Sequence, residues 1–448
     1  MSDVDFFNFA FSHMPLLLIC MGSVSFILYL SIRRKVVLGY LDPLHFYWTF
    51  TFGTGYGVVL ALYLEDFISF YYLCLVAGYA LVFITIFSLS KRRGWWLYRA
   101  VKTLLVPRGA GRFEFMFIFF IYLALAFFLV FNTGLGVSAD TNRFEQNRGV
   151  GAFVRVADGL RLFVLSYLTL ICCRRWSDGQ RGVVTWTCIS TYFVLLIVSS
   201  LLNGAKFAVL EGLYTSLFAV AVQGYRMRVS VAKVAIMLAA VLFFAVWVLG
   251  KNLEQSGIDS ESSGAYMSDT PVLYERLALR ILANGDKYYL SLPNGVIERL
   301  KTDSALIQFL SPLVSVTKMS ELVGHPVNDY TVGRQSLLYW YPDYDTAGGP
   351  TSHFDLFSYK YLGLLPGILF VALIGFLLGS IVNVSRRKAQ GPFYAALCAT
   401  LWLRAIAMLL EPTVGLAYVL DIFIMFFVIK VFGMMLRAAT SPSQRVGV

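Results

Sequence analysis

Charged residues are scarce in this 448-residue chain and make up only 14% of it. Hydrophobic residues account for 58%. A soluble domain carries about 25% charged residues and could not cover this much apolar surface. The composition therefore excludes a soluble fold and predicts an integral membrane protein that crosses a bilayer many times.

Cysteine is also uncommon, and its placement excludes two further classes of protein. The six cysteines lie in or beside apolar segments, without the spacing of a metal site or of a disulfide framework. The sequence also lacks a catalytic metal motif, a phosphate-binding glycine loop and a serine nucleophile elbow. We therefore expect any chemistry to need no metal and no cofactor.

Long apolar runs, by contrast, are abundant. A helix needs about twenty such residues to cross roughly 30 Å of hydrocarbon. We predict an all-α membrane protein with about eleven such helices, of which the fifth is the shortest. The predicted spans are Met14–Ile32, His45–Leu64, Phe67–Leu89, Phe113–Phe131, Gly159–Cys173, Val183–Leu202, Ala205–Gln223, Ser230–Gly250, Phe354–Val384, Pro392–Leu410 and Val414–Leu436.

Basic residues set the predicted orientation. The net charge of +11 does not indicate nucleic acid, because the basic residues cluster in short loops between apolar runs. With eleven spans all of these clusters fall on one side, which the positive-inside rule assigns to the cytoplasm. The clusters are Arg33–Lys35, Lys91–Arg93, Arg174–Arg181, Arg226–Arg228, Arg386–Lys388 and the tail with Arg437 and Arg445.

The spans divide the chain into three parts. Residues 1–250 hold spans one to eight with an outer loop at 133–158, and residues 354–448 hold the last three spans and a cytoplasmic tail. Residues 251–353 form a large outer loop that mixes aromatics, leucines and charges. Such a mixture predicts amphipathic helices on the bilayer surface.

The first outer loop carries Arg143 and Arg148 beside Asp140 and Glu145. Arginines kept on the outer face break the positive-inside pattern. A guanidinium binds phosphate through a planar fork of donors, so these residues favour recognition of an anionic group. The alternative is that they pair with the neighbouring carboxylates or with lipid headgroups.

Further cationic residues lie in or beside the outer segments. Arg276, Arg280 and Lys287 would share one face of a helix, as a ligand surface or as an ordinary solvated face. Lys206 opens the seventh span, where a cation needs an anionic partner or snorkels to the surface. Arg404 and Glu411 are seven residues apart, which favours a structural ion pair.

The last outer segment, 332–355, combines Arg334 with aromatic and carboxylate residues. Aromatic rings stack on sugars and carboxylates accept hydrogen bonds from hydroxyl groups, so this mixture suits a sugar site. His353 has the near-neutral pKa of a general base, although a histidine here is also commonly a hydrogen-bonded anchor. The candidate sugar-binding residues are Tyr341, Asp343, Asp345 and Asp355.

The stretch Gly348–Gly367, followed by Gly375 and Gly379, resembles the bacterial O-antigen and oligosaccharide repeat-unit polymerases of the Wzy type. Those proteins also carry a polar outer loop that runs into a glycine-spaced span. The resemblance extends to the number of spans and to the large outer loop before the last helices. It implies a lipid-phosphate-dependent glycosyltransferase bundle of the GT-C type, with a large periplasmic loop, in the bacterial inner membrane.

The resemblance also implies an activity and its partners. Such an enzyme transfers one glycan from undecaprenyl diphosphate to the non-reducing-end hydroxyl of another lipid-linked glycan at the periplasmic face. Its partners would be undecaprenyl-diphosphate-linked oligosaccharides, membrane lipids and a chain-length regulator, with no nucleic acid. In this reading Arg143, Arg276, Arg334 and His353 are catalytic, and Arg148, Arg280, Lys206 and Lys287 bind the diphosphate.

Two alternatives remain open at the level of sequence. A related O-antigen ligase would use a lipid A core as acceptor, and the motifs separate it weakly from a polymerase. A transporter or flippase would move the same lipid-linked oligosaccharide without making a bond. Transporters often carry charges deep within several spans, whereas the charges in this sequence gather in outer segments.

Overall fold

The computed structural model describes residues 1–107, 111–134, 149–203, 208–225, 264–267, 270–346, 348–387 and 391–440, with single positions between 239 and 250. These parts of the chain are helical and include no β-strand. Most of the predicted eighth span, Ser230–Gly250, lies outside the described residues. So do Arg143, Arg148 and Lys206.

Seven of the described helices are long and apolar enough to cross a membrane, so the chain is an α-helical membrane protein. Four of them have an interior free of charge, and the other three carry charged residues within the span. The seven are α2 (Met14–Ile32), α4 (Phe70–Arg93), α6 (Arg112–Thr133), α8 (Gly151–Ser177), α19 (Leu364–Arg386), α20 (Pro392–Ala405) with the turn Ile406–Leu409, and α21 (Pro412–Thr440).

Three predicted spans form helices of a different kind. The second begins as a π-helix, His45–Thr51, and continues as α3 (Phe52–Leu64). The sixth and seventh form the apolar helices α9 (Val183–Asn203) and α10 (Ala208–Val222), and α10 has only 15 residues.

Two predicted spans differ most from the structure. The fifth span begins at Gly151 rather than Gly159, because the first turns of α8 carry charged residues that interrupt the apolar run. The ninth span is broken into α18 (Phe354–Leu362) and α19. The break falls at Gly363, whose φ of +77° is a left-handed conformation that favours glycine.

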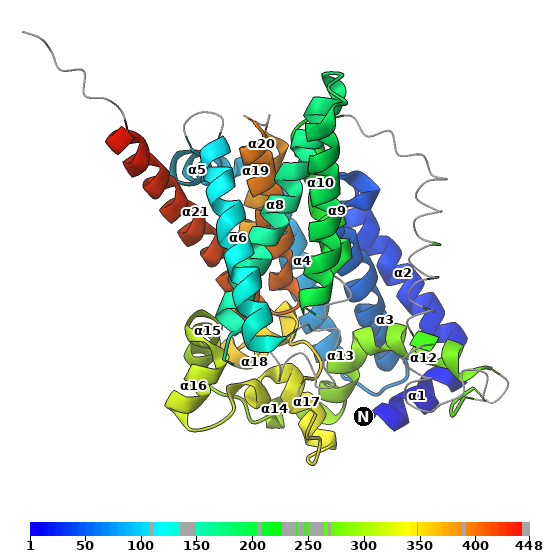
Figure 1. The fold of residues 1–448 in the computed structure, drawn as a ribbon. Coiled ribbons are helices and arrows are strands. Elements are labelled where there is room, and N and C mark those ends of the chain that lie inside the picture. The colour runs from blue at the N-terminus through cyan, green and yellow to red at the C-terminus, as the bar shows by residue number, and fades with distance from the viewer. Residues whose placement is uncertain are drawn as a thin grey trace, which may run out of the picture.

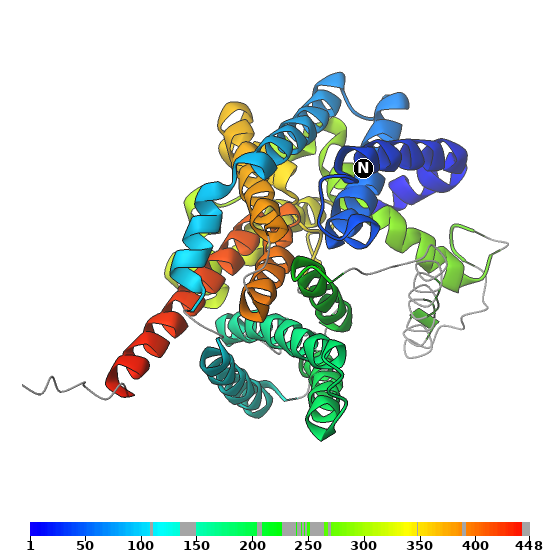
Figure 2. The same cartoon turned by 90° about the horizontal axis from the view of Figure 1, so that it is seen from above.

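The long helices run side by side, and shorter helices gather beneath one end of the bundle (Figures 1 and 2). We call this the loop end. Its helices are α1 (Asp3–Ser12), α12 (Val272–Leu282), α13 (Asp286–Ser291), α14 (Val296–Arg299), α15 (Ala305–Val314), α16 (Val316–Val323) and α17 (Val332–Trp340).

The opposite end, which we call the basic end, collects the predicted basic segments. The Lys91 ammonium donates a hydrogen bond to the Arg34 carbonyl (3.1 Å), and Arg386 donates to the Val36 carbonyl (2.6 Å). The helix α5 (Trp95–Ala100) lies at the same end (Figure 1). The alternation of spans therefore brings these three basic segments together, as the sequence predicted.

Glycine spacing sets the closest helix pair, α4 with α19. A Cβ atom at Gly375 would lie 2.8 Å from the Phe83 carbonyl oxygen, and one at Gly379 would lie 2.4 Å from that of Phe87. Only glycine permits this approach, since small residues let membrane helices pack backbone to backbone. Elsewhere α8, α10 and α20 pack against one another and carry the polar groups described next.

Candidate functional site

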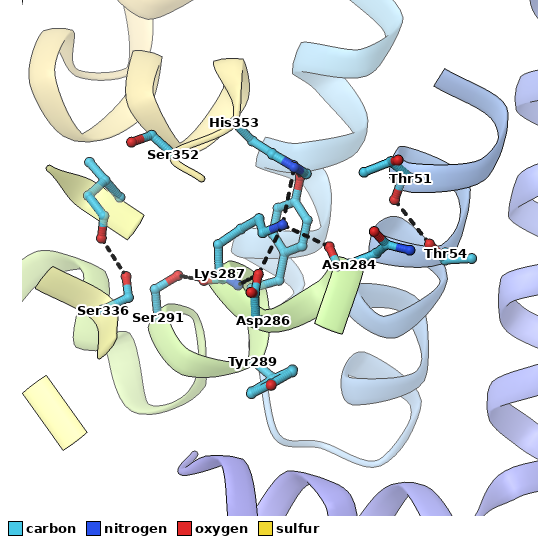
Figure 3. A network of polar contacts seen from close by, with 12 residues as sticks. Thr51, Thr54, Asn284, Asp286, Lys287, Tyr289, Ser291, Ser336, Ser352 and His353 are labelled. Carbon is cyan, nitrogen blue, oxygen red and sulfur yellow. Dashed lines mark hydrogen bonds and ion pairs between the residues drawn. The ribbon is translucent and has the colours of Figure 1, made fainter. Parts of the chain in front are cut away.

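A buried lysine stands at the start of α13, at the loop end of the bundle. The Lys287 ammonium lies 2.9 Å from the Asp286 carboxylate and 3.0 Å from the Asn284 carbonyl oxygen (Figure 3). It also lies 3.2 Å from His353 Nε2, and only 3% of the residue is exposed. A buried ammonium is tolerated when it is paired and hydrogen-bonded in this way.

His353 connects this lysine to a second acid. Its Nδ1 lies 2.9 Å from the Tyr288 hydroxyl, which donates its hydrogen to Asp355 Oδ2 at 2.8 Å. Because a tyrosine has a single hydroxyl hydrogen, the network assigns the other hydrogen to His353 Nδ1, and Nε2 then accepts from Lys287. The chain therefore runs in one direction from Lys287 to Asp355.

The environment keeps His353 neutral. The residue is fully buried at the start of α18, and its backbone amide donates to the Leu410 carbonyl oxygen (2.8 Å). Burial, with the charge of Lys287, holds the pKa of His353 well below its usual range. Since both ring nitrogens are engaged, this geometry gives the predicted general base no free nitrogen for a substrate.

Glu411 is an acid for which the sequence predicted only a structural ion pair with Arg404. It is half-buried between α20 and α21, and its carboxylate accepts a hydrogen bond from the Ser352 amide (2.8 Å). Burial raises its pKa to about 7, with the Ser352 hydrogen bonds and the charge of Lys287 acting in the opposite direction. A carboxylate with this pKa is suited to take a proton at neutral pH.

A second polar group lies within the bundle and consists of Arg155, Arg161 and Arg404, which we call the arginine cluster. Arg155 on α8 pairs with Asp421 on α21 at 2.5 Å. Arg404 on α20 donates to the Arg155 carbonyl oxygen (2.9 Å) and lies 3.5 Å from the centre of the Tyr418 ring. Three spans therefore meet through these contacts.

Arg161 is the most buried member of the arginine cluster. Only 2% of its side chain is exposed, and it pairs with Glu211 on α10 (2.6 Å) and with Asp158 (3.6 Å). Its Nε and Nη1 atoms are buried without a hydrogen-bond partner among the described residues. The Glu211 side chain is 44% exposed, so the cluster reaches the protein surface on this side.

The two sites lie along one stretch of chain. Arg404 ends α20, and Glu411 follows seven residues later, just before α21. The predicted ion pair between them is wrong, because both are described and no contact within 4.0 Å joins them. Charged residues within membrane spans are costly and usually functional, so the arginine cluster qualifies as a site.

Arg334 occupies a different place from the one predicted for it. Its guanidinium donates to the carbonyl oxygens of Tyr344 (2.8 Å), Thr346 (2.9 Å) and Gly348 (2.7 Å), and to the Asp329 carboxylate (3.2 Å). Four of its five N–H donors are thereby used. The geometry makes Arg334 a clamp that shapes the 344–348 loop.

The remaining predicted cations and sugar ligands are dispersed. Arg276 and Arg280 lie exposed on α12, whereas Lys287 is buried. Asp343 and Asp345 are exposed in the loop after α17.

Tyr341 contacts the N-terminal helix, where its hydroxyl accepts from the Asp3 amide (3.2 Å). Of the predicted site residues, the structure unites Lys287, His353 and Asp355. The arginine cluster was not predicted as a site, because its contacts, Arg404 with Arg155 and Arg161 with Glu211, join segments far apart in sequence.

Comparisons of this chain with protein-family models, curated proteins and solved structures give no match. The fold and the site therefore define it as an α-helical membrane protein with buried charged groups at the loop end of its bundle. The functional argument rests on those groups.

Proposed function

We propose that this protein is a polymerase that joins undecaprenyl-diphosphate-linked oligosaccharide repeat units. The observation that carries the proposal is the arginine cluster, in which Arg161 has buried N–H groups without a partner among the described residues and Arg404 precedes the near-neutral Glu411 by seven residues. An unsatisfied buried donor costs about 1–3 kcal/mol. A diphosphate oxygen would satisfy these donors.

The chemistry follows from these two groups. The acceptor hydroxyl attacks the anomeric carbon of the donor sugar, forming a new C–O bond, while its proton passes to Glu411. The bond between the anomeric carbon and the diphosphate oxygen breaks, and the electron pair leaves with the diphosphate. The arginine cluster would stabilise that developing charge with preorganised donors and without a metal.

The buried lysine network would act as a positioning element. The hydrogen bond from His353 to Leu410 fixes the residue that precedes Glu411, and Ser352 binds the Glu411 carboxylate directly. The charge of Lys287 holds the pKa of Glu411 lower than burial alone would. Together these contacts hold the Glu411 carboxylate in position and keep it ionisable near neutral pH.

The finer topology belongs to the same proposal. Ser230–Gly250 would supply an eighth span, giving eleven in a GT-C type bundle in the bacterial inner membrane. The basic end would then face the cytoplasm, and the loop end, with both sites, would face the periplasm. Lipid-linked glycans reach that face, where membrane lipids and a chain-length regulator would also contact the loop helices.

A transporter of lipid-linked oligosaccharide is the second candidate. Two observations favour it: charged residues lie on α8, α10, α20 and α21, and a span is broken at Gly363. Discontinuous helices and charges at membrane depth are common in transporters. An O-antigen ligase would share the proposed chemistry and differ in its acceptor.

Reconstitution distinguishes these functions. The purified protein would be incubated with a synthetic undecaprenyl-diphosphate-linked repeat unit, without metal or nucleotide sugar, and the products resolved by gel. A ladder of polymers supports the polymerase. Translocation of labelled lipid in vesicles without a ladder supports the transporter, and transfer only when a lipid A core is added supports the ligase.

Arg161→Lys tests, in the same assay, whether the buried Arg161 N–H groups bind the diphosphate. Lysine keeps the charge but cannot replace the planar fork. Loss of one such donor typically lowers the rate by about 10²–10³-fold. Arg174→Lys is the matched control, because that side chain is 65% exposed at the basic end. Equal activity of the two variants would count against the diphosphate role.

A further inference from the structure

The helix α15 has its polarity reversed relative to a helix on a soluble protein. Gln308 and Ser311 are buried, each 4% exposed, and face the protein. The opposite face is made of aliphatic residues at spacings of four, three and one, which places them on one side of a helix. These exposed residues are Leu306 (66%), Leu310 (39%), Leu313 (40%) and Val314 (47%).

Contacts on the buried side fix the helix in this orientation. The Gln308 amide donates to the Val327 carbonyl oxygen (3.4 Å). The Phe309 ring meets Phe357 and Phe370 edge to face, with centroids 5.7 Å and 5.3 Å apart. Rotating α15 to bury its leucines would break these contacts, so the leucine face belongs to the packed structure.

The leucine face continues an apolar surface that belongs to a spanning helix. α15 packs against α21, where Leu420, Ile424 and Phe427 are 43%, 55% and 46% exposed. The end of α15 is held to α8, because Arg155 donates to the Pro312 carbonyl oxygen. With ten residues α15 is about 15 Å long, which is half the hydrocarbon thickness.

We infer that α15 lies in the plane of the membrane, with its leucine face in the acyl chains of the leaflet at the loop end. Phospholipid acyl chains are the partner that fits an outward aliphatic face continuous with the lipid-facing surface of α21. Pairing with a second copy of the chain is the competing occupant. The inference does not depend on the proposed activity.

Site-specific quenching tests this placement. The full chain, with its six cysteines replaced by alanine, would carry Leu306→Cys or Leu310→Cys labelled with an environment-sensitive fluorophore in phosphatidylcholine nanodiscs. Ile424→Cys on α21 and Glu321→Cys on α16, both exposed, serve as the lipid and water controls. We expect lipids with brominated acyl chains to quench both α15 labels like the Ile424 label and severalfold more than the Glu321 label.

Aqueous iodide should give the reverse order. If iodide quenches the α15 labels as strongly as the Glu321 label, the helix faces water and the inference is overturned. If neither quencher reaches them and Leu310→Cys forms a disulfide between copies, a second chain covers the face, which also overturns it. Two positions on one face guard against a variant that fails to fold.

Discussion

Individual side chains at this site take their chemistry from their surroundings more than from their residue type. A histidine has the ordinary pKa of a base at neutral pH, whereas a glutamate is ordinarily far too acidic. Here burial lowers the pKa of His353 and raises that of Glu411 to about 7. The two residues therefore exchange the roles that their intrinsic pKa values suggest.

Glu411→Gln should abolish most of the proposed polymerase activity. The amide still accepts the Ser352 hydrogen bond but cannot take a proton, so we expect kcat/KM to fall by about 10²–10⁴-fold. In the unchanged protein, kcat/KM should rise with pH through about 7, since the carboxyl must lose its proton to act as a base. A pH profile of ladder formation measures both.

A stable, membrane-inserted Glu411→Gln variant that polymerises normally would rule out the assigned base. The Glu411 carboxyl should affect stability with the opposite pH dependence, since its contribution to stability falls as the pH rises. Its pKa in the folded protein lies above the ordinary 4.5, so its contribution to stability is fully present below pH 4.5 and is lost as the pH rises through about 7. Optimal activity and maximal stability should therefore separate on the pH axis.

Lys287→Gln should move the pH profile without moving the substrate affinity. The Lys287 charge lowers the pKa of Glu411, so removing that charge should shift the rising limb of kcat/KM to higher pH. Lys287→Arg keeps the charge and is the matched control, so its rising limb of kcat/KM should stay at the pH of the unchanged protein. If Lys287 has only a structural role, both variants should instead give less folded protein, and the rising limb of kcat/KM should stay at the same pH.

At the scale of helices, glycine positions divide into those that set packing and those that do not. Gly379→Ala should destabilise the protein by about 1–3 kcal/mol, because its Cβ would lie 2.4 Å from the Phe87 carbonyl oxygen of α4. Gly78 lies on α4, and a Cβ atom added there would meet nothing within 4 Å. Gly78→Ala should therefore be neutral or stabilising by up to about 1 kcal/mol. Thermal unfolding in detergent compares them, and equal midpoints would show that α4 and α19 are not in close contact.

Helices are also the scale at which the sequence was most informative. Apolar runs predicted the bounds of α2 and α9 to within a residue or two. The start of α8 was missed because Arg155 and Asp158 lower its local hydropathy, although both are paired within the fold. The break at Gly363 was missed, since hydropathy does not report a left-handed backbone conformation at a glycine.

The site was less predictable than the helices for a physical reason. Neighbouring residues could be grouped by spacing, which brought attention to Lys287 and His353 singly but not as partners 66 residues apart. Arg155 and Arg404 are 249 residues apart and meet only because α8 packs on α20. Contacts of this range depend on tertiary packing, which a single sequence does not display.

For the whole molecule, charge and topology give a consistent polarity. Basic residues gather at one end, while the buried lysine, Glu411 and the loop helices lie at the other (Figure 1). We expect such a bundle to insert with its basic loops in the cytoplasm, because moving short basic loops across the membrane is unfavourable. The proposed chemistry depends on this polarity, since it places both sites on the outer face.

Reporter fusions test that polarity directly. Fusions after Ser177 and Arg387, at the basic end, should give the signal of a cytoplasmic reporter. Fusions after Asn328 and Asp343, at the loop end, should give a periplasmic signal, for example active alkaline phosphatase. If all four signals are reversed, the positive-inside assignment fails and the enzyme would act on cytoplasmic substrates. If the Asn328 and Asp343 fusions are cytoplasmic and the Arg387 fusion is periplasmic, seven spans rather than eight precede the loop end, and Ser230–Gly250 does not cross the membrane.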